Sequence, residues 1–259
     1  MRERYVRFAI PEQDRIWWGT VDGDDVIAMT DAPYNQGSVT TDRWPRADVR
    51  ILAPAIPSKI ICIGLNYHAH VKASYSADEA PERPLIFLKP PSSIIGPGDE
   101  ILHPTVSERV DYEAELGVII GKRARNVAEK DAMTCVFGYT CVNDVTARDL
   151  QKADGQWSRA KGFDTFCPVG PEIITDFDPS DILVEGIHNG EVKQSGRTSQ
   201  MIFKIPFLIS YISSIMTLEP GDLISTGTPS GIAPMKPGDS IEVRIETVGS
   251  LVNSVAAPS

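Results

Sequence analysis

The sequence RVDYEAELGVIIG occupies residues 109–121 and determines how the rest of the chain is interpreted. Its aromatic and branched residues favour a β-strand, and Gly121 ends the run, so we predict one extended strand here. Side chains alternate between the two faces of a strand. Glu113 and Glu115 are two residues apart and are therefore expected on the same face.

Two carboxylates on one strand face repel each other, and burying either of them without a partner costs free energy. Glu113 and Glu115 therefore require either water or a cation. Hydrophobic strand formers follow Glu115 directly, which is not the charge-rich context of an ordinary solvated edge. Strand geometry alone leaves two alternatives of equal weight, a metal site and an exposed acidic face.

The composition limits the classes of partner. The chain has 259 residues and a formal net charge of -10, which argues against nucleic acid or an anionic membrane surface as a partner. An anionic substrate would need a local cation. No apolar run approaches the ~20 residues of a membrane span. The first residues lack the apolar core of a signal peptide, so a cytoplasmic protein is expected.

The chain divides into two predicted domains. Short β-like segments separated by Pro, Gly and Asp turns fill residues 1–55, which predicts a small N-terminal β domain. Residues 56–259 are predicted to form the main domain, which contains all the candidate functional residues. Most of its segments read as short strands, and helices are expected at residues 145–153 and 198–216. The fold class is therefore α+β and predominantly β.

Asp144 stands where a predicted strand meets a predicted helix. Its carboxylate could cap the backbone N–H groups of that helix, which is a common structural role. Arg148 and Gln151 follow at helical spacing, so the three side chains would line one face. Together with Glu113 and Glu115, Asp144 would supply three hard oxygen ligands, a set that suits Mg²⁺ or Mn²⁺.

Other candidates follow in predicted loops. His68 and His70 lie after a short strand, where a histidine suits general-base chemistry, although a hydrogen-bonded surface histidine is the alternative. Lys161 lies in a glycine-containing loop that could bind an anion or form a solvated basic patch. Thr228 lies in a hydroxyl-rich turn that could bind a carboxylate or serve only as a β-turn. The chain lacks the His and Cys spacing of a zinc site.

Four motifs together resemble the fumarylacetoacetate hydrolase family. They are residues 112–122 (YEAELGVIIGK), 138–151 (GYTCVNDVTARDLQ), 161–171 (KGFDTFCPVGP) and 226–232 (TGTPSGI). The match looks closest to bacterial members with acylpyruvate hydrolase or oxaloacetate decarboxylase activity. The resemblance implies a mixed β-sandwich roll in the catalytic domain and a homodimer.

The resemblance also implies roles for individual residues. The implied ligands of a Mg²⁺ or Mn²⁺ ion are Glu113, Glu115 and Asp144. The positions that usually hold the substrate's carboxylate and oxo group, or order water, are Arg148, Gln151, Lys161 and Thr228. The implied catalytic residues are Lys161 and His70, which matches the family's histidine before a lid.

The implied reaction is metal-dependent hydrolysis of a C–C bond in an acylpyruvate-type 2,4-dioxo acid, through a metal-stabilised enolate. C–C hydrolases of the family pair the histidine with a Glu three residues later, whereas this chain has Ala73. Oxaloacetate decarboxylation and isomerisation of the 2-hydroxyhepta-2,4-diene-1,7-dioate type share that kind of intermediate and stay open as alternatives. An alternative of another class is a catalytically degenerate protein that binds a 2-oxo acid.

Overall fold

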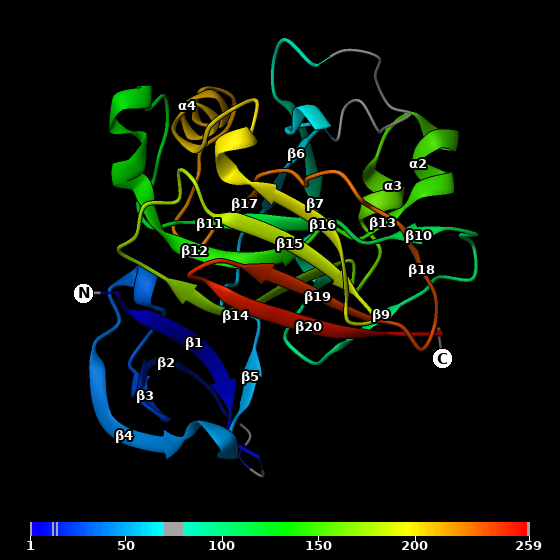
Figure 1. The fold of residues 1–259 in the computed structure, drawn as a ribbon. Coiled ribbons are helices and arrows are strands. Elements are labelled where there is room, and N and C mark those ends of the chain that lie inside the picture. The colour runs from blue at the N-terminus through cyan, green and yellow to red at the C-terminus, as the bar shows by residue number, and fades with distance from the viewer. Residues whose placement is uncertain (1, 12, 14, 70–79, 258–259) are drawn as a thin grey trace.

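The computed structural model describes residues 2–11, 13, 15–69 and 80–257 and consists mainly of β-strands (Figure 1). The predicted fold class, mainly β with a small N-terminal β region, is confirmed. In the described part of the chain, no helix is both long enough and apolar enough to cross a membrane.

The largest sheet joins the N-terminal strands to the main domain. Its strands, in spatial order, are β4 (Val39–Pro45), β3 (Asp25–Met29), β2 (Ile16–Asp22), β1 (Arg4–Ala9), β14 (Cys167–Ile174), β12 (Val136–Asn143), β11 (Ala114–Ile120), β17 (Leu223–Ser225), β6 (Ile60–Gly64) and β7 (Leu85–Lys89). Off this path, β5 (Arg50–Leu52) pairs with β1, and β8 (Ile94–Ile95) pairs with β14. The sheet is mixed, because β17 and β6 run parallel whereas β11 and β12 run antiparallel.

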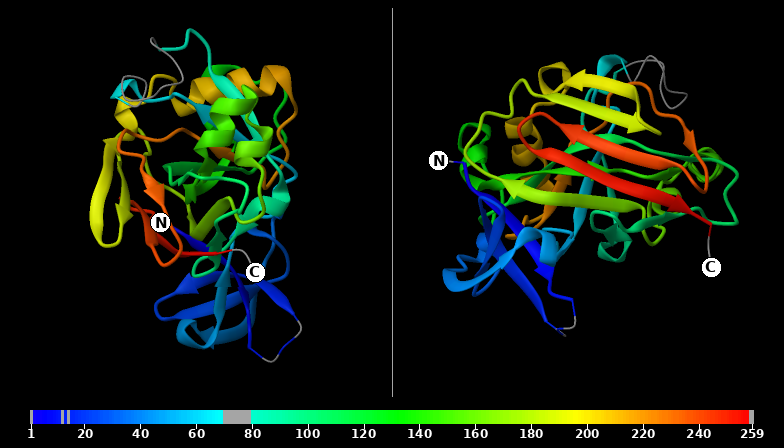
Figure 2. Two further views of the ribbon diagram at one scale, coloured as in Figure 1. Left: turned by 90° about the vertical axis from the view of Figure 1, so that its right-hand side faces the viewer. Right: turned by 60° about the horizontal axis from the view of Figure 1, so that its bottom comes forward.

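A second sheet packs on the first. Its strands, in order, are β16 (Glu191–Arg197), β15 (Leu183–His188), β19 (Ser240–Ile245), β20 (Gly249–Ala256) and β9 (Glu100–Leu102). Val118 and Cys141 of the large sheet share one buried core with Val184, Val243 and Leu251 of the second sheet. Figure 2 shows the two sheets from other sides, with the blue N-terminal strands at one end. This packing is a mixed β-sandwich.

Short elements complete the molecule. A small sheet contains β13 (Thr146–Ala147), β10 (Val110–Asp111) and β18 (Pro234–Met235). The α-helices that lie wholly within the described residues are α2 (Arg148–Asp154), α3 (Ser158–Lys161) and α4 (Ile205–Ile215). The 3₁₀ helices are η1 (Pro33–Asn35), η2 (Arg46–Asp48), η3 (Pro91–Ser93), η4 (Glu129–Cys135) and η5 (Thr198–Gln200). The single helix predicted at 198–216 is wrong in extent: η5 and α4 are separate, and Pro206 lies in the first turn of α4, where its fixed φ favours a helix start.

The predicted strand at residues 109–121 is two strands in different sheets. β10 ends at Asp111 and β11 begins at Ala114. Side-chain amides replace the ladder bonds at the break: Asn143 Oδ1 accepts from the Glu113 N–H at 2.9 Å, and Gln194 Oε1 accepts from the Ala114 N–H at 2.9 Å. The alternation of residue types shows the strand pattern on both sides, but it does not show these distant amides.

The N-terminal strands are attached to β14 through a buried acid. Glu172 on β14 is 1% exposed. Its carboxylate accepts from Arg4 Nε at 2.6 Å and forms an ion pair with Arg46. Both arginines belong to the N-terminal strands and the helix that follows them. The predicted domain division between residues 55 and 56 falls between β5 and β6 and stays a prediction.

Replacing Glu172 by Gln should lower the free energy of unfolding by about 1 to 3 kcal/mol, because one carboxylate contacts two arginines at a buried point. Urea unfolding monitored by tryptophan fluorescence measures the change. Asp22→Asn is the control, because the Asp22–Arg43 pair is exposed on both sides and should contribute less than about 1 kcal/mol. Equal effects of the two substitutions would contradict the anchoring role of Glu172.

Candidate metal centre

Three buried carboxylates meet at one point of the main domain. One oxygen from each of Glu113, Glu115 and Asp144 lies within 4.8 Å of the others. Glu113 lies in the link before β11, Glu115 lies on β11, and Asp144 directly follows β12. Because β11 and β12 pair with Ala114 opposite Asn143, the two segments bring the three acids together. The face shared by Glu113 and Glu115 is thus a buried one, and the alternative of an exposed acidic face is wrong.

Two buried lysines contact this carboxylate cluster. Lys161 Nζ lies 2.5 Å from Asp144 Oδ2 and 3.0 Å from Glu113 Oε2. Lys89 Nζ donates to Asp144 Oδ1 at 2.5 Å and to the Val145 carbonyl at 2.9 Å. Burial opposes the charged form of Lys161, but Asp144 and Glu113 outweigh this effect and raise the pKa of Lys161. Lys161 lies at the end of helix α3, where the sequence predicted a loop.

The side chain of Asp144 does not cap a helix. The helix predicted at 145–153 begins only at Arg148, and its N-cap residue, Ala147, forms no side-chain cap. Residues 146–147 instead form β13, which pairs with β10. The carboxylate of Asp144 is therefore directed to Lys89 and Lys161. The capping alternative considered for Asp144 is wrong.

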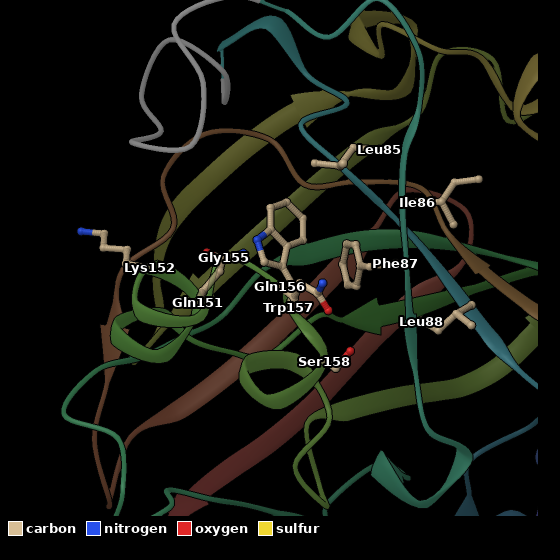
Figure 3. Close-up of a pocket in the computed structure, with 10 residues that line it drawn as sticks. All are labelled: Leu85, Ile86, Phe87, Leu88, Gln151, Lys152, Gly155, Gln156, Trp157 and Ser158. Atoms are coloured by element: carbon tan, nitrogen blue, oxygen red, sulfur yellow. The ribbon is translucent and has the colours of Figure 1, made fainter.

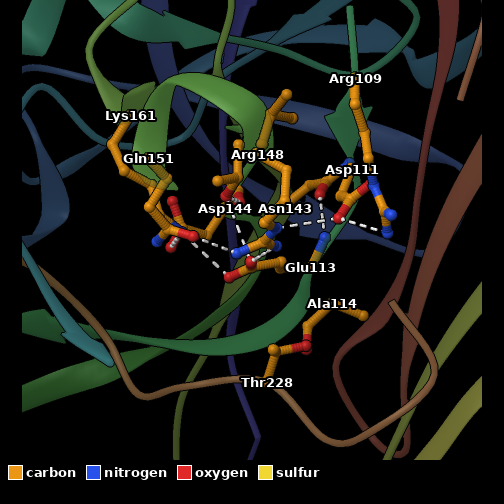
Figure 4. Close-up of polar contacts among 12 residues, drawn as sticks. Arg109, Asp111, Glu113, Ala114, Asn143, Asp144, Arg148, Gln151, Lys161 and Thr228 are labelled. Carbon is orange, nitrogen blue, oxygen red and sulfur yellow. Dashed lines mark hydrogen bonds and ion pairs between the residues drawn. The ribbon is translucent and has the colours of Figure 1, made fainter. Parts of the chain in front are cut away.

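Arg148 connects the cluster to a fourth buried acid, Asp111 (Figure 4). Its guanidinium donates from Nε to Asp111 Oδ2 at 2.9 Å, from Nη1 to Gln151 Oε1 at 2.6 Å, and from Nη2 to Glu113. Arg109 contacts the same Asp111 carboxylate, with 2.9 Å between Arg109 Nε and Asp111 Oδ1. Arg148 and Gln151 therefore lie together beside Glu113. The hydrogen bond to Asp111 fixes the orientation of the Arg148 guanidinium.

Glu115 is buried against the two other acids of the cluster. Its Oε2 accepts from Ser225 Oγ at 2.6 Å and from the Gly227 N–H at 2.8 Å. Burial, then the charges of Asp144 and Glu113, raise its pKa to about 8. The donors and Lys161 only partly offset these effects, so the pocket lacks positive charge at Glu115.

Thr228 also lines the site, and its hydroxyl binds a backbone carbonyl of β11. Its hydroxyl donates to the Ala114 carbonyl at 2.9 Å and accepts from Gln194 Nε2 at 2.8 Å. The same small cavity is lined by Thr228, the three carboxylates, Arg148, Gln151 and Lys161. The structure thus brings together these seven predicted residues, whereas the candidate His68 is exposed and lines a separate pocket. His70 and Ala73 lie outside the described residues.

The donor set fits a divalent cation. Three carboxylate oxygens converge with no sulfur or imidazole ligand among the described residues of the cavity, which is the set that Mg²⁺ or Mn²⁺ accepts. The raised pKa of Glu115 also indicates that the site lacks positive charge, because a cation beside this carboxylate would favour its ionised form. Glu113, Glu115 and Asp144 are therefore the residues that would hold the ion.

Lys89, Asp111 and Gln194 were not among the residues predicted from the sequence. Asp111 could have been predicted, because residues 111, 113 and 115 are all acidic and are spaced two residues apart. Lys89 ends an apolar strand before a proline, where lysine is ordinarily read as a surface residue. Gln194 sits in the middle of a hairpin strand, and its sequence context gives no indication that it reaches Ala114 and Thr228.

A larger groove of about 900 Å³ adjoins the carboxylate cavity (Figure 3). Phe87, Gln151 and Trp157 line both spaces. The groove therefore opens from the site itself.

Comparison with known proteins gives two family matches and several close relatives. Residues 59–256 match the family model described as fumarylacetoacetate (FAA) hydrolase C-terminal, and residues 3–54 match one described as Rv2993c-like, N-terminal. Protein Rv2993c of Mycobacterium tuberculosis is 45% identical, with 97% of each chain covered. The human mitochondrial protein named oxaloacetate tautomerase FAHD2A is 43% identical, with 82% of this chain and 71% of the human protein covered.

A solved structure agrees with the fold over nearly its whole length. The crystal structure of 2-hydroxyhepta-2,4-diene-1,7-dioate isomerase from Mycobacterium marinum superposes with a TM-score of 0.91 at 42% identity, covering 99% of each chain. The architecture described above is therefore shared with that structure.

Proposed function

Because this chain belongs to the fumarylacetoacetate hydrolase family, we propose that it is a divalent-metal-dependent enzyme that interconverts a 2-oxo acid and its enol. Oxaloacetate tautomerisation is the first reaction to test, since a relative 43% identical to this chain is named for it. The observation behind the proposal is the buried cluster of Glu113, Glu115 and Asp144, with Lys161 against it and Arg148 and Gln151 in the same cavity.

A cation held by the three carboxylates would supply Lewis-acid stabilisation of negative charge on oxygen. The chain's own residues would orient the substrate around that point. Arg148 and Gln151, side by side on helix α2, are proposed to bind the substrate's carboxylate. Lys161 adds a fixed positive charge within a buried site, where charge stabilisation needs little reorganisation. His70 is proposed to move the proton at the carbon next to the oxo group, on its sequence match alone.

Hydrolysis of acylpyruvate-type 2,4-dioxo acids, the reaction expected from the sequence, is the second candidate. The groove beside the cavity favours it, because an acyl tail needs space beyond the 2-oxo acid. Ala73 in place of the usual Glu weighs against it, because water activation relies on that pair. The homodimer and the cytoplasmic location stay predictions.

A substrate panel tests the proposal. We expect oxaloacetate enol–keto interconversion, followed by the enol's ultraviolet absorbance, to be accelerated with Mg²⁺ or Mn²⁺ and to return to the background rate with a chelator. Acylpyruvate cleavage and oxaloacetate decarboxylation are followed separately through released pyruvate and CO₂. Absence of every activity with both metals would leave the isomerase and the degenerate binding protein as the remaining alternatives.

A further inference from the structure

The groove beside the cavity has an apolar wall formed by an edge strand. β7 is the last strand of the large sheet, and Leu85 and Leu88 on it are 40% and 47% exposed. Both leucines line the groove, but side chains alternate along β7, so that Leu85 lies on the same side as Phe87 and Trp157 and Leu88 lies on the other side (Figure 3). Exposed leucines on a sheet edge are costly unless something covers them.

Two aromatic rings stand where the groove meets the cavity. Phe87 and Trp157 contact edge to face, with 5.1 Å between ring centroids, and Figure 3 shows them side by side. Lys161 Nζ lies 4.9 Å from the Phe87 ring, which connects the pair directly to the carboxylate cluster. Gly64 leaves room for the indole, because a Cβ there would lie 2.6 Å from the Trp157 ring. A molecule extending from the cavity into the groove would therefore pass along these rings.

Charge is nearly absent from the groove. Among its described lining residues, Lys152 is the one ionisable side chain, and no acid is present. Figure 3 shows its amino group directed away from Phe87 and Trp157. A second carboxylate beside Leu85 and Trp157 would meet no cation from the groove wall, because Lys152 is directed away from the rings. The surface beside the site thus matches an uncharged alkyl chain.

We propose that this groove binds an uncharged aliphatic tail of the substrate, with Phe87, Trp157 and Leu85 as the residues that determine specificity. The inference rests on the proposed function, since the tail belongs to the 2-oxo acid bound at the carboxylate cluster. A 2-oxo acid with an apolar chain would bind more tightly than pyruvate, and one ending in a second carboxylate would gain little.

Titration calorimetry in the presence of Mg²⁺ tests the tail site through binding alone. The probes are pyruvate, 2-oxobutanoate, 2-oxohexanoate and 2-oxooctanoate, together with the diacid 2-oxohexanedioate. We expect the dissociation constant to fall about two- to fourfold per added methylene, as partial to full burial of a CH₂ group predicts. The diacid should bind more weakly than 2-oxohexanoate.

Leu85→Asn should reduce the gain per methylene to less than about 1.5-fold, because it makes the wall polar at nearly constant size. Val252→Thr is the matched control, since Val252 is 44% exposed on β20 and does not line the groove, and it should keep the full chain-length dependence.

The two proposals fail differently. Equal affinity across the series, or tighter binding of the diacid, overturns the apolar tail site, and the proposed function stands if oxaloacetate is still enolised. A chain-length dependence that Leu85→Asn abolishes supports the tail site even if no turnover is found, in which case the proposed function is the one that fails.

Discussion

Glu115→Gln is expected to abolish metal-dependent turnover, with a loss of at least about 10³-fold in kcat/KM for whichever 2-oxo acid is the substrate. Glutamine has nearly the same size and can still accept from Ser225 Oγ and the Gly227 N–H. It removes the negative charge and leaves one fewer carboxylate for the cation. Because even outer-shell partners of a metal are worth 10- to 100-fold in affinity, metal affinity should fall by more than about 100-fold.

Two measurements separate this prediction from general damage to the fold. Mn²⁺ binding is measured by calorimetry, and turnover is measured over a range of metal concentrations. Glu129→Gln is the matched control, because it removes one carboxylate from an exposed position of η4 and should change neither quantity. If Glu115→Gln kept the wild-type affinity for Mn²⁺ and the wild-type rate, the assignment of the carboxylate cluster as a metal site would be wrong.

The sequence was sufficient to predict which residues form strands, because the local pattern of apolar side chains determines them. Apolar residues at alternating or continuous positions predicted strands at residues 109–121 and 138–144, where β11 and β12 are found. The break at Tyr112 and Glu113 was not predictable, because Asn143 and Gln194 supply its hydrogen bonds from 30 and 80 residues away. Long-range amide contacts of this kind have no local periodicity.

The same distinction applies to the site. Acids spaced two residues apart on a strand indicate their common face locally, so Glu113 and Glu115 were identifiable as a pair. Lys89 meets Asp144 only because β6 and β7 lie beside β17 and β11 in the sheet, an order that the sequence does not contain. Charge balance in a buried site is therefore a property of the tertiary fold, although the need for it can be inferred from the acids alone.

The stability of the metal-free protein should fall as the pH rises from about 5 to about 8. Burial, Asp144 and Glu113 raise the pKa of Glu115 in the folded state to about 8, against 4.5 for an ordinary Glu. Between these two values the unfolded chain has released this proton and the folded chain has kept it. Stability decreases with pH wherever the folded state binds more protons, so the free energy of unfolding should drop by about 2 to 4 kcal/mol across this range.

Urea unfolding in a chelator at several pH values measures this loss. Glu115→Gln should remove most of the slope, because glutamine has no proton to release, whereas Glu129→Gln should retain it. Excess Mg²⁺ or Mn²⁺ should reverse the trend, since a cation binds the ionised carboxylates of the folded state and stabilises that state by mass action. A metal-free protein whose stability is flat from pH 5 to pH 8 would show that Glu115 is already ionised there, with Lys161, Lys89 and Arg148 balancing the three acids.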